Sequence, residues 1–141
     1  MSRQFTYGRQ ERLKSRKLIE QLFREGRSLS AFPFRVYYLL KEKEAAGAKG
    51  VPAVVQCGFG VSSRQFKKAV DRNRVKRVSR EAWRLQKQPL TDAMAARPEQ
   101  LALFFIYTGK ELPDFNFVKE KTAVIVNKLT AIIHETRPLN T

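Results

Sequence analysis

An apolar residue at every second position predicts a β-strand over residues 28–40. The even positions are Phe32, Phe34, Val36, Tyr38 and Leu40. We expect this face of the strand, Phe34 included, in the core, while Arg35 and Tyr37 lie on the other face. Pro33 has no backbone N–H to donate, which indicates an edge position or a bulge.

Two shorter apolar runs predict further strands at residues 53–61 and 101–108. The first run contains Gly58 and Gly60, and glycine within a strand indicates a bulge or a close backbone approach. The second run, LALFFIYT, is the most hydrophobic of the chain, which is typical of a buried central strand.

Helical spacing predicts a first helix that is capped by Ser15, runs to about Arg24 and stops at Gly26. Its apolar stripe consists of Leu18, Ile19, Leu22 and Phe23. Such a stripe is usually core, but four large apolar residues are generous for so short a helix. We therefore expect part of the stripe to line a groove.

Two longer helices are predicted, one over residues 70–87 and one from Asp114 or Asn116 to about Glu135, ended by Pro138. Residues 91–96 fit one extra helical turn. The order helix, strand, strand, basic helix, strand, helix predicts a small α+β domain in which helices cover one sheet. We place this domain at residues 13–135, after a basic, weakly ordered arm (1–12) and before a tail (136–141).

Residues 70–87, VDRNRVKRVSREAWRLQK, separate cations from apolar side chains on one helix. At about 100° per residue, one arc holds Arg72, Asn73, Lys76, Arg77, Arg80, Arg84 and Lys87. The opposite arc holds Val75, Val78, Ala82 and Leu85, with Arg74 near the seam. Solvated faces usually mix signs, whereas like charges four residues apart repel, so this face predicts a dense anion such as a nucleic-acid backbone. Trp83, beside the cationic arc, either packs against the sheet or stacks on RNA.

The charge of the chain is strongly uneven. Its formal net charge is +15, and residues 1–90 hold 22 Lys/Arg against 7 Asp/Glu, whereas residues 91–141 hold 6 of each. The cationic field therefore belongs to the first two-thirds of the chain, which favours a directed binding surface. The connection at residues 62–68, with Arg64 and Lys68, is expected to contribute to phosphate binding.

Composition excludes several classes of site. With one cysteine, Cys57, and one histidine, His134, the chain can form neither an internal disulfide nor a usual zinc cluster, and we expect a buried thiol in a reducing compartment. A Cys57–His134 nucleophilic pair is disfavoured because His134 falls in the last helix. No apolar run reaches the ~20 residues that span a membrane, and the N-terminus lacks an apolar signal stretch. We expect a cytoplasmic protein without a membrane partner.

Arg35 and Tyr37 place a cation and a flat ring on the same face of the first strand. This pair suits an unstacked nucleotide, with the ring under the base and the charge on the phosphate. A mixed sheet face with a half-buried Tyr37 explains the strand equally well, so both interpretations stay open at this point.

The run Arg72-Asn73-Arg74-x-Lys76-Arg77-x-x-Arg80 resembles the "RNR" signature of the protein component of bacterial ribonuclease P. Further segments share the resemblance: Arg12-Leu13-Lys14, Phe34-Arg35-Val36-Tyr37-Tyr38, Gly58-Phe59 and Phe66-Lys67-Lys68-Ala69-Val70. It covers roughly Phe5 to Ile133. Two places depart from the family's pattern, which has paired lysines where Ser62-Ser63-Arg64-Gln65 stands and commonly Phe where Ile19 stands.

The resemblance implies an α/β sandwich with a four-stranded sheet and a left-handed strand–helix–strand crossover that carries the signature. It implies a subunit that binds the catalytic RNA and the 5′ leader of precursor tRNA, while that RNA, with bound Mg²⁺, removes the leader. No catalytic side chain, protein-bound metal or protein partner is implied. The residues implied for binding the RNA subunit are Arg72, Asn73, Arg74, Lys76, Arg77, Arg80, Arg84 and Lys68. Those implied for the leader are Ile19, Phe23, Arg35, Tyr37 and Arg64.

Two other functions compete with this one. A general RNA-binding or ribosome-assembly protein would share the same charge pattern without a role in tRNA processing. A stand-alone nuclease would need convergent carboxylates to hold its metal ions, and the basic region has only Asp71 and Glu81.

Overall fold

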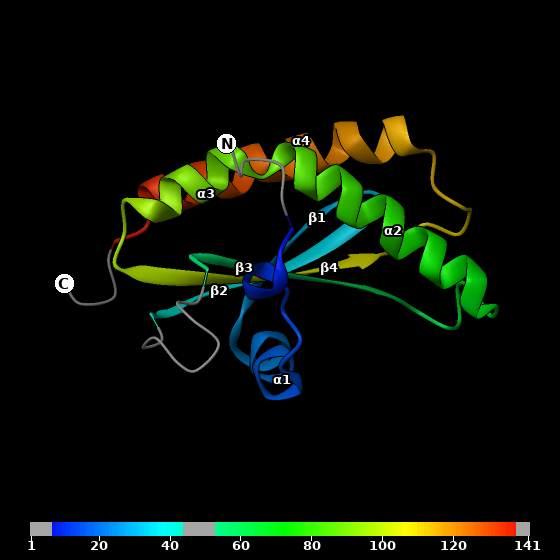
Figure 1. Ribbon diagram of the computed structural model, residues 1–141, viewed down its shortest axis with the longest axis horizontal. Coiled ribbons are helices and arrows are strands. Elements are labelled where there is room, and N and C mark those ends of the chain that lie inside the picture. The colour runs from blue at the N-terminus through cyan, green and yellow to red at the C-terminus, as the bar shows by residue number, and fades with distance from the viewer. Residues whose placement is uncertain (1–6, 44–52, 138–141) are drawn as a thin grey trace.

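Four strands form one mixed sheet in the order β1-β2-β4-β3. The computed structural model describes residues 7–43 and 53–137 of the chain (Figure 1). The strands are β1 (Arg27–Ala31), β2 (Phe34–Glu42), β3 (Val55–Val61) and β4 (Glu99–Tyr107). The helices are η1 (Arg9–Glu11, a 3₁₀ turn), α1 (Arg16–Glu25), α2 (Ala69–Gln86), α3 (Gln88–Ala95) and α4 (Phe115–Glu135). This arrangement confirms the predicted α+β class.

The pairing of the strands explains why the basic helix lies where it does. β1 with β2 and β2 with β4 are antiparallel, whereas β3 and β4 are parallel neighbours. A parallel pair needs a crossover connection, and α2 with α3 provides it. The central position predicted for the run 101–108 is confirmed, since β4 pairs on both sides. The left hand of the crossover stays a prediction from the resemblance.

The sheet separates two apolar layers of unequal size. Helices α2, α3 and α4 cover one face and α1 covers the other (Figure 1). The larger layer contains Phe34, Val36, Trp83 and Phe105, and the smaller one is built from Leu13, Leu18, Leu22 and Ala102. Because neighbouring residues of a strand face opposite ways, the predicted core face of β2 is confirmed for Phe34 and Val36.

The single strand predicted over residues 28–40 is wrong, because this segment is a hairpin. Phe32 and Pro33 form the turn between β1 and β2, and the peptide bond between them is cis. Pro33 cannot donate to a strand ladder, and its carbonyl accepts from the backbone N–H of Thr108 at 2.7 Å. Phe32 therefore leaves the core face and is 65% exposed.

The helix boundaries follow their capping residues. Ser15 Oγ accepts from the backbone N–H of Leu18 at 3.2 Å, and α1 ends at Gly26, as predicted. Asp114 caps α4 in the same way, at 3.1 Å from the backbone N–H of Phe117. The helical turn predicted at residues 91–96 begins earlier, because Pro89 is well suited to the first turn of a helix. The predicted stop at Pro138 lies outside the described residues.

Residues 7–13, called here the N-terminal strap, pack against β3 instead of forming a weakly ordered arm. The hydroxyl of Tyr7 and the backbone N–H of Leu13 both donate to the carbonyl of Cys57. Glu11 forms an ion pair with Lys87, which is buried at the end of α2. The strap thus connects the two sides of the sheet at its β3 edge. Residues 1–6 lie outside the described part.

Candidate nucleic-acid interface

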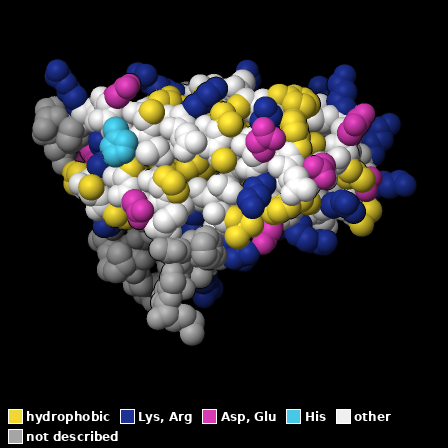
Figure 2. Space-filling view, turned by 90° about the horizontal axis from the view of Figure 1, so that it is seen from above, with side chains coloured by type: hydrophobic (Ala, Val, Ile, Leu, Met, Phe, Trp, Pro, Cys, Tyr) yellow, Lys and Arg dark blue, Asp and Glu magenta, His cyan; other side chains and the backbone are white. Residues whose placement is uncertain are grey.

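Helix α2 presents its cations on the side away from the sheet. The side chains that it buries are Val75, Ser79, Ala82 and Trp83. Beyond its first two residues, Ala69 and Val70, the exposed side chains of α2 are Asn73, Arg74, Arg77, Arg80 and Glu81. Lys and Arg side chains also gather toward the end of the molecule at which α2 begins (Figure 2). We call the surface formed by Asn73, Arg74, Arg77 and Arg80 the α2 face.

The buried side of α2 is turned relative to the prediction. Trp83 and Ser79 are buried, whereas Val78 and Leu85, which were expected inside, are only half-buried. The reason is the size of Trp83: its indole packs edge-on against Phe105, with ring centroids 5.7 Å apart, and turns the helix toward it. This packing decides the open question about Trp83 in favour of the core. It also moves Arg74 from the seam into the exposed face.

Arg72 and Arg84 are held by contacts within the protein. One guanidinium nitrogen of Arg72 donates to the carbonyls of Phe66 and Lys67, both at 2.8 Å, so it fixes the loop that leads into α2. Arg84 donates to Glu81 at 2.5 and 3.1 Å, and this hydrogen bond lowers the pKa of the Glu81 carboxyl. Lys76 is half-buried, and Lys68 is exposed at the N-cap.

The opposite face of the sheet carries a cluster of aromatic side chains beside α1, where the resemblance implies the cleft for the leader, and we call it the aromatic cleft. Tyr37, Phe104 and Gly58 are register partners in one row across the strands, and Arg35, Ile106 and Gly60 form the next row. Phe23 of α1 contacts Tyr37 and Phe104 edge-on, with centroids 4.9 and 5.4 Å away. Ile19 packs on the same cluster.

The exposures in this cleft separate its lining from the core. Phe23 is 44% exposed and Arg35 is exposed, while Tyr37 is half-buried. An aromatic side chain exposed beside two others and a cation forms a platform on which an unstacked base can stack. The structure therefore brings Ile19, Phe23, Arg35 and Tyr37 together, and it places Phe34 on the other face, as expected.

The chain matches proteins of one family along most of its length. The family model described as Ribonuclease P matches residues 7–130. The chain belongs to the ribonuclease P protein family. A "Ribonuclease P protein component" from Porphyromonas gingivalis is 36% identical over 115 residues, which cover 82% of this chain and 80% of that protein. Another, from Chlorobium phaeobacteroides, is 32% identical over 126 residues, 84% of each.

Solved structures agree with this membership. The ribonuclease P protein from Thermotoga maritima has a TM-score of 0.56 and 27% identity, and the match covers 84% of this chain and 96% of that one. The Staphylococcus aureus protein, at 17% identity and a TM-score of 0.56, shares the fold. The family is that of the protein component of an endoribonuclease that matures tRNA 5′ ends, so the predicted family is confirmed.

Phe104 is the cleft residue of this family member that the sequence analysis missed. A Cβ added at Gly58 or Gly60 would lie 2.8 Å from its ring, so the two glycines make room for Phe104 to lie over β3. Gly58 and Gly60 were the sign in the sequence, because glycine within a strand indicates a bulge or a close backbone approach. What approaches is the side chain of the neighbouring strand.

Arg64 lies in the exposed loop between β3 and α2. Its backbone N–H donates to Ser62 Oγ at 3.0 Å, and Gln65 next to it donates to the carbonyl of Thr108 at 3.5 Å. The carboxyl ends of the parallel strands β3 and β4 meet at this edge. The role in leader binding that the resemblance implies for Arg64 stays a prediction.

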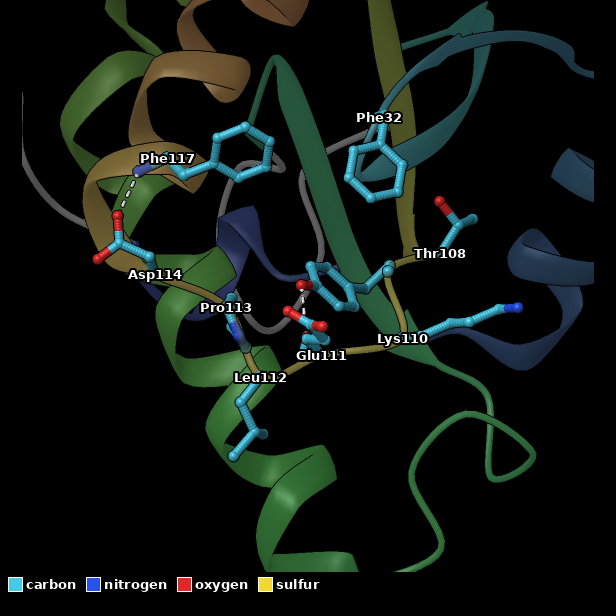
Figure 3. Close-up of a pocket in the computed structure, with 10 residues that line it drawn as sticks. Phe32, Thr108, Lys110, Glu111, Leu112, Pro113, Asp114 and Phe117 are labelled. Carbon is cyan, nitrogen blue, oxygen red and sulfur yellow. Dashed lines mark hydrogen bonds between the residues drawn. The ribbon is translucent and has the colours of Figure 1, made fainter.

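A pocket of about 450 Å³ opens at the same end of the sheet, between the β1–β2 turn and the start of α4. The rings of Phe32 and Phe117 face each other across it at 6.2 Å, while Lys110 extends away (Figure 3). Its charged lining consists of Lys110, Glu111 and Asp114. This mixed charge distinguishes it from the cationic surfaces, and the sequence analysis did not predict it.

Neither a nucleophile nor a metal cluster stands out in the described residues. Cys57 is fully buried, and burial raises the pKa of its thiol, the opposite of what a nucleophilic thiolate requires. No group of three or more His, Cys, Asp or Glu lies close enough to hold a metal ion within residues 7–43 and 53–137. No helix in that part is long and apolar enough to cross a membrane.

Proposed function

We propose that this protein is the subunit of ribonuclease P that holds the catalytic RNA on one side and the 5′ leader of precursor tRNA on the other. The α2 face docks on the RNA subunit, with Lys68, Lys76 and the outward parts of Arg72 and Arg84 around it. The aromatic cleft takes the single-stranded leader. The protein then works in the cytoplasm, where its RNA partner and precursor tRNA are made.

The observation that carries this proposal is the chemical difference between two surfaces separated by one sheet. The α2 face offers Arg74, Arg77 and Arg80 in a row along a rigid helix, which suits the closely spaced phosphates of folded RNA. The cleft offers aromatic rings on which an unpaired base can stack, whereas the bases of a duplex are already stacked on one another. A precursor tRNA supplies such bases in its leader.

In this proposal, the RNA subunit and the protein have different tasks, because the two molecules offer different groups to a metal ion. Metal-ion hydrolysis of a phosphodiester needs oxygen ligands that converge on the ions. In this proposal RNA phosphates hold the Mg²⁺, and the cations of the protein lower the repulsion between the two RNAs. The protein orients the leader, and the RNA subunit supplies the chemistry.

Reconstitution tests the proposal directly. The purified protein is mixed with a bacterial ribonuclease P RNA and precursor tRNA at low Mg²⁺ and near-physiological salt, and release of the leader is measured. We expect cleavage only when protein and RNA are both present. Cleavage by the protein alone would favour a stand-alone nuclease, and an RNA reaction unchanged by the protein would favour a general RNA-binding protein.

A further inference from the structure

A second cationic site lies between the N-terminal strap and the start of α1. It is a pocket of about 370 Å³, called here the strap pocket, whose lining includes Arg9, Arg12, Lys14, Ser15 and Gln56. The charged residues that line it are all cations. Three like charges around one hollow repel one another, so the pocket is expected to favour an anion.

The acidic side chain of the strap, Glu11, has its charge engaged outside the strap pocket. Glu11 pairs with the buried Lys87 and accepts from the backbone N–H of Gly8 at 3.0 Å. Glu11 therefore fixes the strap without lining the hollow. The pocket between Phe32 and Phe117 differs here, because carboxylates line it together with its lysine.

The cations of the strap pocket stand on an anchored backbone. The backbone N–H of Leu13 donates to the carbonyl of Cys57 at 3.1 Å, and Arg12 Nε donates to the carbonyl of Tyr7 at 3.3 Å. The Arg12 guanidinium also lies over the Tyr7 ring, 5.2 Å from its centroid. The backbone and Arg12 are therefore already ordered before a ligand binds, which lowers the entropy lost on binding.

The strap pocket lies beside α2 at the β3 edge of the sheet. Glu11 of the strap pairs with Lys87 at the end of α2, and the guanidinium of Arg12, which lines the pocket, lies over the Tyr7 ring. Burial raises the pKa of the Tyr7 hydroxyl, and the charge of Arg80 on α2 acts in the opposite direction, as expected if the two surfaces are neighbours. An RNA that docks on α2 reaches the pocket if it curves around this edge.

We propose that the strap pocket binds a backbone phosphate of the RNA subunit, as an extension of the α2 face. This inference rests on the proposed docking of α2 on that RNA. It adds a second contact region, so that the RNA subunit contacts both α2 and the N-terminal strap.

The salt dependence of binding to ribonuclease P RNA tests this inference. The variant Arg9→Ala with Lys14→Ala removes two charges from the pocket and keeps Arg12, which supports the strap through Tyr7. We expect the slope of log K against log salt to fall by about one to two units. A matched control, Lys119→Ala with Lys128→Ala on the exposed side of α4, removes the same charge and should leave the slope unchanged. An unchanged slope in the pocket variant, or an equal fall in the control, overturns the inference.

The variant Arg77→Ala with Arg80→Ala separates the two proposals. If it lowers the slope and the pocket variant does not, the strap pocket is no RNA site and the docking of α2 stands. If neither variant lowers the slope, both proposals fail. If both lower it, the RNA subunit contacts both surfaces.

Cross-linking identifies the RNA that enters the pocket. Lys14→Cys carries a photoactivatable group into the reconstituted holoenzyme with precursor tRNA bound, and Cys57 is too buried to react with the reagent. We expect adducts on the RNA subunit. Adducts on the leader, or no adduct on either RNA, overturn the assignment of the pocket to the RNA subunit.

Discussion

The α2 face and the aromatic cleft lie on opposite sides of the same sheet and differ in almost every physical respect. The α2 face carries arginines on the outside of an 18-residue helix. The cleft is lined by Phe23, Tyr37 and Phe104, with Arg35 beside them. Charge attracts a phosphate backbone whatever its sequence, whereas rings require bases that are free to stack. In the proposed function, this difference separates a docking surface from a substrate surface within one small domain.

The two regions also differ in how firmly they are anchored. Helix α2 packs into the larger apolar layer through Trp83, Val75 and Ala82. Helix α1 rests on the smaller layer through Leu18 and Leu22. We therefore expect substitutions behind α2 to affect the whole fold, and substitutions in the cleft to affect binding.

The largest expected effect comes from the core behind α2. Trp83→Ala should lower the free energy of unfolding by about 3–5 kcal/mol, because Trp83 is only 1% exposed and its loss leaves a cavity. Phe23→Ala is the matched aromatic control in the cleft, and we expect a clearly smaller loss since Phe23 is 44% exposed. Urea denaturation measures both. Equal losses would mean that the two helices are anchored alike.

The next effect concerns the charge of the α2 face. Arg77→Ala with Arg80→Ala should weaken binding to the RNA subunit by about 10- to 100-fold near physiological salt and lower the salt slope by about two units. Discrimination between leader-bearing and mature tRNA should stay as in the wild type. A loss of that discrimination with an unchanged slope would reverse the roles of the two surfaces.

Removal of a ring from the cleft should weaken binding of the leader and leave binding to the RNA subunit unchanged. Tyr37→Ala should weaken binding of leader-bearing precursor by about 1–3 kcal/mol if a base stacks there, and should spare mature tRNA. Tyr37→Phe keeps the ring and should keep most of the affinity. If both tRNAs lose equally, Tyr37 is not part of the leader site.

A smaller effect on leader affinity is expected from Gly60, which makes room for the ring of Phe104. In Gly60→Ala, the new Cβ would lie 2.8 Å from the ring of Phe104, which must shift. Leader affinity should fall by less than in Tyr37→Ala. Gly8→Ala is the control, since its Cβ would meet only Glu11 Oε2, at 3.8 Å. Equal leader affinity in both variants would remove Phe104 from the platform.

The smallest effect concerns the strap that joins the two sides. Burial raises the pKa of the Tyr7 hydroxyl above its usual value near 10, so the folded state keeps a proton that the unfolded state releases. This contribution to stability is complete below pH 10 and is lost as the pH rises beyond it. Urea denaturation at pH 8 and pH 10.5 should show wild type and Tyr7→Phe growing closer at the higher pH. A constant difference would mean that Tyr7 titrates normally.

The sequence predicted which residues face which way better than it predicted where the chain turns. The alternation predicted over residues 28–40 separated Phe34 and Val36 from Arg35 and Tyr37, because the side chains of a strand point alternately to its two faces. The same alternation continues through Phe32, so the hairpin turn was hidden within it. Pro33 marked the place but did not distinguish a bulge from a turn.

The rest depended on contacts between distant segments. Helix α2 is turned relative to the prediction because Trp83 packs on Phe105 of β4. A helical wheel shows only the residues of one helix and cannot predict this contact. The strap is held by the pairing of Tyr7 with Cys57 and of Glu11 with Lys87, residues far apart in the chain. The cationic residues of α2 could be identified from spacing alone, but their separation from the cleft required the sheet.

The sheet between the two surfaces has a consequence for where the leader is cut. Between the two surfaces lie the sheet and helix α2, which packs on the sheet and exposes its cations on the other side, and a close-packed interior of this kind is hardly compressible. In the proposed complex, the leader on one side and the docked RNA on the other are therefore kept at a constant separation. In that complex, the protein would hold any leader with unpaired bases at the same distance from the RNA subunit, and this distance would help to fix the position of the scissile bond.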